Sequence, residues 1–233
     1  MKSLRMSRVF PLLLLICSQS SLAAAFGGYV TLTTDYVKRG VTQSDGDPAL
    51  QLGAELSFDS GFYLGAWGST IDINNGPTRQ RDQEVNYYAG YVFSATDSLR
   101  FSATAVAYSY PGQTGSVDYN YQEYSLTGNF DDRVWLEFAY SPDLYNTGYS
   151  STNIDLYAEW PINGKWAIGA GAGQYDTSDL TGKSYQYWQL GITRSFWWAD
   201  IDLRFHDTDS WVPIISNPER AKSRVALTIQ IPF

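Results

Sequence analysis

Apolar side chains fall at every second position in one segment of this sequence after another. The last nine residues, VALTIQIPF, show the pattern most clearly: Val225, Leu227, Ile229, Ile231 and Phe233 alternate with small or polar residues. LQLGAELSF, RVWLEFAY and NIDLYAEW repeat it earlier in the chain. Because successive side chains of a β-strand point to opposite faces, this period of two predicts strands that are apolar on one face and polar on the other.

The alternation recurs in twelve segments. At ~3.3 Å per residue and a tilt of roughly 45°, a segment of about ten residues crosses ~25 Å, the height of the apolar band of an outer-membrane barrel. The segments are residues 27–37, 49–59, 61–70, 83–93, 98–109, 118–129, 132–141, 151–160, 165–175, 183–194, 196–207 and 221–233. The sequence therefore predicts an all-β fold, a transmembrane antiparallel up-and-down β-barrel of about 12 strands.

The connections between these segments alternate between short and long. Short turns are expected at residues 59–60, 94–97, 130–131 and 161–164 and around Ser195, and longer polar loops at residues 38–48, 71–82, 110–117, 141–150, 176–182 and 208–220. This alternation requires an even number of strands with both chain ends on the side of the short turns. It is the layout of a bacterial outer-membrane barrel, with short periplasmic turns and longer extracellular loops.

Bulky aromatic side chains flank the expected short turns. They are Phe58, Phe62, Phe93, Trp160, Trp166, Trp197, Trp198 and Phe233. The alternative fold, a soluble β-sandwich, would bury these aromatics in its core, but it does not require a regular alternation of short and long connections. We therefore favour the barrel and interpret these aromatics as a girdle at a membrane interface.

The first 25 residues have the features of a secretory signal peptide. Lys2, Arg5 and Arg8 precede an apolar run at residues 10–16, and alanines at residues 23–25 supply a cleavage site. A lipoprotein is the alternative, because Cys17 follows the apolar run, but Ile16 stands where a small residue is expected. We predict cleavage before Phe26, which leaves residues 26–233 as the barrel in the outer membrane of a Gram-negative bacterium.

Loss of the signal peptide makes the chain more acidic. The number of basic residues falls from 16 to 13 against 24 acidic ones, and the formal net charge falls from −8 to −11. This charge disfavours binding of nucleic acid. The single Cys lies in the removed segment, so we expect no disulfide framework. We expect no cofactor and no dedicated metal site.

The C-terminal segment resembles the recognition signal of outer-membrane proteins, in which alternating apolar residues precede a final Phe. The resemblance implies that the barrel-assembly machinery reads Val225, Leu227, Ile229, Ile231 and Phe233.

A second resemblance covers the first third of the chain. TTDYVKRGVTQSDGDPALQLGAEL (residues 33–56) and SGFYLGAWGS (residues 60–69) resemble the TorF-type porin family, proteobacterial outer-membrane proteins long described as conserved hypothetical. The resemblance implies a signal peptide, a membrane barrel and a pore. It implies no particular substrate and no catalytic residues.

If the apolar face of each strand contacts lipid, most ionisable side chains face the interior. The candidate lumen-lining residues are Asp35, Glu55, Glu84, Arg100, Glu123, Arg133, Glu137, Asp155, Glu159, Asp202 and Arg204. A mainly acidic lining favours a porin or narrow channel for passive diffusion of small polar solutes, with a preference for cations. The alternative is a non-conducting barrel, structural or surface-interacting, whose interior is filled by a charge network.

Inward-facing aromatic side chains leave two interpretations open, a stacking surface for sugars or nucleosides and bulky filler of a small interior. They are Tyr63, Trp67, Tyr88, Tyr108, Tyr157 and Tyr187. Lys38 and Arg39 are expected at the extracellular rim. There they would bind lipopolysaccharide phosphates or, as we favour, pair with acidic residues of the loops.

An outer-membrane hydrolase is the third interpretation of the barrel. Such an enzyme uses a His that is oriented by a carboxylate or amide beside a nucleophile or an activated water. His206 is the single histidine of the chain, and we expect it as a solvated residue at the outer end of its strand. We therefore predict no enzymatic activity. Nearby, Asn217 and Pro218 are expected to open a short helical turn, with Asn217 as its cap.

Overall fold

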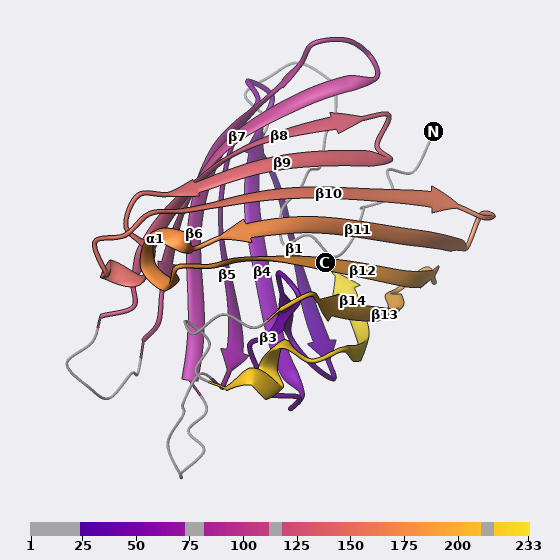
Figure 1. Cartoon of the computed structure of the whole chain (residues 1–233). Coiled ribbons are helices and arrows are strands. Elements are labelled where there is room, and N and C mark those ends of the chain that lie inside the picture. The colour runs from indigo at the N-terminus through magenta and orange to yellow at the C-terminus, as the bar shows by residue number, and fades with distance from the viewer. Residues whose placement is uncertain (1–23, 73–81, 112–117, 211–216) are drawn as a thin grey trace.

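The computed structural model is a closed barrel of twelve antiparallel strands (Figure 1). It describes residues 24–72, 82–111, 118–210 and 217–233. The barrel strands are β1 (Ala24–Thr33), β4 (Ala49–Phe58), β5 (Phe62–Ile71), β6 (Asp82–Ser94), β7 (Leu99–Ser109), β8 (Tyr121–Phe130), β9 (Val134–Ser141), β10 (Ser151–Pro161), β11 (Trp166–Asp176), β12 (Ser184–Ser195), β13 (Asp200–Thr208) and β14 (Arg224–Pro232). Each pairs with the next around the ring, and β14 pairs with β1 to close it. The predicted fold class is confirmed.

The strand boundaries agree with the predicted segments to within four residues at each end. Even the glycine-rich ninth segment forms a strand, β11. Its glycines at residues 169 and 173 face the interior, where an added Cβ would collide with the rings of Tyr157 and Tyr187. The strand is rich in glycine because tyrosines of its neighbours lie against its backbone.

The two ends of the barrel differ as predicted. The turns at residues 59–61, 95–98, 131–133, 162–165 and 196–199 lie at one end, which we call the short-turn end, together with the start of β1 and the end of β14. At the other end, the long-loop end, lie η1 (Leu144–Asn146), α1 (Ser178–Thr181) and η2 (Pro218–Ala221). None of the helices in the described ranges is long and apolar enough to cross a membrane. Residues 1–23 lie outside the described ranges, and cleavage before Phe26 stays a prediction.

The two faces of the barrel wall have opposite character. Leucines such as Leu52, Leu126 and Leu203 are about half exposed on the outside, whereas Thr31, Ser102 and Thr193 are buried inside. The aromatics predicted to form a girdle lie near the short-turn end, and all of them are exposed except Trp166, which is half-buried. An apolar outer face and a polar inner face are the reverse of a soluble globular protein.

Adjacent residues of β8 test which face contacts lipid. Leu126→Lys places a charge on the outer face near the middle of the strand, and it is expected to lower the free energy of unfolding by ~2–4 kcal/mol. Ser125→Lys places the same charge on the inner face, where Ser125 is half-buried, and its effect is expected to be clearly smaller. Urea titration of refolding into lipid vesicles measures both. Equal losses would contradict the assignment of the two faces.

Candidate functional site

The chain leaves the barrel wall after β1 and folds into the interior. Residues 36–43, which we call the inner hairpin, contain β2 (Val37–Lys38) and β3 (Val41–Thr42), and the Gln43 N–H donates to the Tyr36 carbonyl at 2.6 Å. Val41 is buried in an interior cluster. The other members of that cluster are Val106, Tyr108, Tyr121, Leu144, Tyr175, Tyr185 and Tyr187. Since these residues come from β7, β8, β11, β12 and η1, the hairpin crosses the interior away from β1.

The tip of the inner hairpin is a tight turn. Arg39 and Gly40 both have positive φ, 49° and 77°, which is the backbone geometry of a two-residue hairpin turn that follows the twist of its strands. A Cβ on Gly40 would stand 2.5 Å from Thr208 and 2.7 Å from Tyr187. Glycine is therefore required at this position both by the turn and by the approach of the far wall.

The two basic residues of the tip are paired with acidic residues inside the barrel. Arg39 Nη2 lies 2.9 Å from both carboxylate oxygens of Glu123 on β8, and its guanidinium stacks 4.5 Å from the Tyr175 ring centroid. Lys38 Nζ lies 3.9 Å from Glu84 on β6 and 3.8 Å from the Tyr108 ring centroid. The expected position of Lys38 and Arg39 at the extracellular rim is thus wrong, because these strand carboxylates draw them inward.

Burial and charge act in opposite directions on these two cations. Burial lowers the pKa of Lys38, and the Glu84 carboxylate only partly opposes this. Burial also lowers the pKa of Arg39, but Glu123 and the surrounding tyrosines raise it to well above its usual value. Arg39 therefore stays charged and held by Glu123.

Ion pairs also hold the base of the inner hairpin. Asp35 accepts hydrogen bonds from Ser44 Oγ at 3.1 Å and from Arg224 Nη1 at 2.6 Å. Arg220 of η2 lies 3.5 Å from Asp72, next to the base of the hairpin. η2 begins as predicted, with the Asn217 side chain accepting from the Glu219 N–H at 3.0 Å. Ion pairs and hydrogen bonds at the long-loop end therefore hold the hairpin inside the barrel.

The structure divides the predicted lining residues that face the interior into a buried group and a half-buried group. One predicted residue, Arg133, does not lie on the inner face. The buried group consists of Asp35, Glu84, Glu123, Asp155, Asp202 and Arg204. The half-buried group consists of Glu55, Arg100, Glu137 and Glu159. Arg133 lies instead in the exposed turn between β8 and β9, with Nε 3.7 Å from Asp131, because β9 starts two residues later than the predicted segment.

Two carboxylates of the half-buried group are held by uncharged partners. Glu55 accepts a hydrogen bond from the Tyr88 hydroxyl at 3.2 Å, and Glu137 accepts one from Thr127 Oγ1 at 3.2 Å. Neither hydroxyl compensates the negative charge. The hydrogen-bond partners of Glu55 and Glu137 thus bring no positive charge, whereas Glu84 and Glu123 beside the inner hairpin are paired with Lys38 and Arg39.

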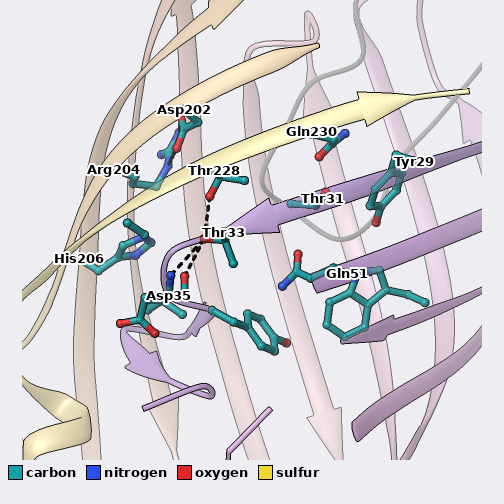
Figure 2. Close-up of a pocket in the computed structure, with 14 residues that line it drawn as sticks. Tyr29, Thr31, Thr33, Asp35, Gln51, Asp202, Arg204, His206, Thr228 and Gln230 are labelled. Carbon is teal, nitrogen blue, oxygen red and sulfur yellow. Dashed lines mark hydrogen bonds and ion pairs between the residues drawn. The ribbon is translucent and has the colours of Figure 1, made fainter. Parts of the chain in front are cut away.

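A cavity of about 90 Å³ lies beside the base of the inner hairpin (Figure 2). Its walls come from β1, β4, β5, β13 and β14, and it is lined by Tyr29, Thr31, Thr33, Asp35, Tyr36, Val37, Gln51, Trp67, Asp202, Arg204, His206, Ala226, Thr228 and Gln230. His206 is only 7% exposed, so its expected position as a solvated residue is wrong. Because its side chain projects from the inner face of β13, it is covered by the barrel and by the residues before the hairpin.

The inward-facing aromatic side chains lie in two different environments. Tyr108 and Tyr187 pack in the cluster around the inner hairpin, where Tyr108 and Tyr121 stack with centroids 4.4 Å apart. Trp67 instead lines the cavity and makes an edge contact with Tyr36 at 5.4 Å. Filling of the interior therefore accounts for the first pair, and Trp67 is buried in a second cluster with Tyr36, Ala49 and Ile71.

Solved structures of small porins share this architecture. The KdgM porin has a TM-score of 0.56 at 11% sequence identity, covering 90% of this chain and 99% of that chain. The NanC porin has a TM-score of 0.54 at 10% identity, with the same coverage. These identities show likeness of fold alone. No curated protein matches the sequence.

The sequence itself matches one family. A model described as a bacterial protein of unknown function, Gcw_chp, matches residues 18–230, which is most of the chain. The protein therefore belongs to the Gcw_chp family of bacterial proteins.

Proposed function

We propose that this protein is an outer-membrane channel for passive diffusion of small polar solutes, with the inner hairpin as its constriction. The observation that carries the proposal is the closed barrel with an apolar outer face, whose interior is charged and is crossed by a hairpin near the long-loop end. The fold of KdgM and NanC and the resemblance to TorF-type porins support the same activity. In this proposal the short-turn end faces the periplasm and the long-loop end faces the exterior.

The channel is proposed to prefer cations. Glu55 and Glu137 project into the barrel from β4 and β9, and their hydrogen-bond partners are neutral hydroxyls. Carboxylates on the wall of a narrow aqueous passage attract cations and repel anions. Arg100 on β7 offsets this only in part, because it lies beside Asp132 and donates to Asn129.

A non-conducting barrel is the second candidate function, and the buried Arg39–Glu123 pair is the observation that favours it. Arg39 and Glu123 side chains are 10% and 7% exposed, and tyrosines pack around them. If the hairpin never moves and no passage remains beside it, the barrel serves as a surface structure that presents its long loops.

The proposal includes no enzymatic activity. The carboxylates nearest to His206 in the cavity, Asp35 and Asp202, are bound by Arg224 and Arg204. This leaves neither of them in the role of a partner that orients the imidazole for catalysis. Lipopolysaccharide, outer-membrane lipid and the barrel-assembly machinery remain proposed partners of the loops, the outer face and the C-terminal strand.

Conductance of the refolded chain in a planar lipid bilayer tests the channel and its charge preference together. Steady current steps with a greater permeability for potassium than for chloride are expected. Glu55→Gln combined with Glu137→Gln should lower the permeability ratio of potassium to chloride several-fold, because two interior carboxylates are lost. Glu219→Gln, in the exposed η2 turn, is the matched control and should leave the ratio unchanged.

Two outcomes would contradict this proposal. If correctly folded protein carries no current across the bilayer, the non-conducting barrel is favoured. If the permeability ratio of potassium to chloride is the same in the double variant and in the wild type, residues elsewhere in the barrel determine the ion selectivity.

A further inference from the structure

We infer that Arg194, on the outer surface of the barrel at the short-turn end, binds the phosphate of an anionic phospholipid headgroup. The inference goes beyond the proposed channel, because it requires that the barrel spans the membrane but not that it conducts. It adds the charge class of the lipid and the residues that contact it.

Arg194 is the only basic side chain on the outer face of the described barrel strands. These strands contain four arginines and no lysine. The other three arginines face the interior beside carboxylates, in the pairs Arg100–Asp132, Arg204–Asp202 and Arg224–Asp35. Arg194 follows Ile192 by two positions on β12, and both side chains are exposed. Since alternate residues of a strand share a face, Arg194 points away from the interior.

Two aromatic rings contact the Arg194 guanidinium. β11 and β12 lie side by side (Figure 1), and Trp166 of β11 is the direct partner of Arg194. The Arg194 Cζ lies 5.1 Å from the Trp166 ring centroid and 4.6 Å from that of Phe196. Such rings attract and position the cation. They supply neither the full negative charge nor the oxygen acceptors that a carboxylate offers to the N–H groups of arginine.

No acidic group neutralises this surface within the parts of the chain that the structure describes. Neither Arg194 nor the exposed side chain of Lys165 makes an ion pair there. The Lys165 carbonyl accepts from the Ser195 N–H at 2.8 Å, so Lys165 lies beside the end of β12. Two cations therefore share one spot on a chain whose net charge is negative. An anion that binds here is attracted by these local charges and not by the protein as a whole.

The position of Arg194 along its strand matches the level of the lipid headgroups. It is the last residue but one of β12, and the turn that follows contains Phe196, Trp197 and Trp198, of which Trp197 is 95% exposed. Tryptophans of this kind mark the interface between membrane and water. A charge on the outer face is strongly unfavourable near the middle of the membrane but is tolerated at the interface.

The chemistry of the site selects an anionic phosphate. The planar guanidinium can donate two parallel hydrogen bonds to the oxygens of one phosphate. The two cations are complemented by a headgroup such as that of phosphatidylglycerol, whose phosphate is not neutralised by an amine of its own. A choline or ethanolamine headgroup brings a positive charge next to Arg194 and Lys165 and is disfavoured.

Native mass spectrometry of the refolded chain in detergent micelles counts the lipid molecules that stay bound, with no need for conduction. Phosphatidylglycerol is expected to be retained at concentrations at which phosphatidylcholine is not. Arg194→Gln is expected to weaken the retention of phosphatidylglycerol about tenfold, because the charge-assisted hydrogen bonds are lost. Arg194→Lys keeps the charge but loses the planar fork, so its affinity should lie between the two.

Arg133→Gln is the matched control. It removes one positive charge from another turn at the short-turn end, where Arg133 Nε lies 3.7 Å from Asp131, and it should retain phosphatidylglycerol as the wild type does. Equal retention by the Arg194→Gln and wild-type chains, or equal retention of the two lipids by the wild type, would overturn the inference. Inorganic phosphate in excess is expected to leave the lipid bound. Its displacement of the lipid would mean that the site takes a free anion, and the assignment to a lipid headgroup would fail.

The channel and the lipid site stand or fall separately. Current steps in a chain that retains phosphatidylglycerol equally well without Arg194 would overturn the lipid site and leave the channel standing. Retention that depends on Arg194 in a barrel that carries no current would support the lipid site and count against the channel.

Discussion

Replacing residues 37–42 by two glycines is expected to raise the single-channel conductance several-fold. The replacement is compatible with the fold because Tyr36 and Gln43 already form a backbone hydrogen bond of 2.6 Å, so a two-residue turn can join them. It removes Lys38, Arg39 and Val41 from the interior. Since the hairpin crosses the barrel at the long-loop end, its removal widens the proposed constriction.

The same deletion is expected to increase the preference for cations. Glu123 and Glu84 lose Arg39 and Lys38, their basic partners, and two more carboxylates then face the widened passage. The folded barrel should also become less stable in urea, because breaking a buried ion pair on one side costs ~3–5 kcal/mol unless water reaches the remaining charge. Planar-bilayer recording and urea titration measure the two effects.

A matched control comes from the same end of the barrel. Replacing α1 (residues 178–181) by two glycines shortens an element with no buried residue, and it should leave conductance and selectivity near their wild-type values. Unchanged conductance in a folded hairpin deletion would mean that the constriction lies elsewhere. A silent wild type that conducts after the deletion would identify the hairpin as a complete plug.

Deleting Phe233 is expected to abolish assembly of the barrel in cells. β14 and β1 pair over only five residues, 228–232 with 29–33, whereas β1 pairs with β4 over ten. Phe233 extends this short pairing of β14 with β1, which we call the seam, by two backbone hydrogen bonds to Gly28, of 2.9 and 3.0 Å. Its ring lies over Gly28, where an added Cβ would stand 2.6 Å from it. Closure therefore depends strongly on the last residue.

Two measurements distinguish loss of the seam from loss of an assembly signal. Refolding of the pure chain into vesicles needs only the seam, whereas assembly in cells also needs recognition of the C-terminal strand. Phe233→Asp should keep the backbone hydrogen bonds and refold in vitro, yet fail to assemble in cells if the machinery reads the aromatic ring. Phe233→Tyr is the conservative control and should assemble. Normal assembly of the Phe233 deletion would contradict both roles.

The wall of the barrel was predictable because its physical cause is local. A strand between an apolar exterior and a polar interior must alternate with a period of two, and that period can be counted in the sequence for all twelve strands. The inward direction of Glu84, Glu123 and Asp202 followed from the same alternation. Arg133 was misplaced because it lies at a strand end, where a shift of two residues moves a side chain from the wall into a turn.

The contents of the barrel were not predictable in the same way. Arg39 and Glu123 are 84 positions apart, and no periodic pattern links a loop residue to a partner on a distant strand. The motif Lys38-Arg39-Gly40 contains the positive-φ turn, but a turn of this kind is equally compatible with an exposed loop. His206 was expected in solvent for the same reason, since its cover comes from residues that follow β1.

The sequence by itself determined the strands, their faces, their number and the alternation of turns, because each depends on residues that are neighbours along the chain. Only the tertiary structure decided that the first long connection folds into the barrel and that a cavity forms beside it. Closure of the ring brings the carboxylates of β6 and β8 to face the chain leaving β1. Buried charges must be paired, and the cations that pair with Glu84 and Glu123 are supplied by that chain.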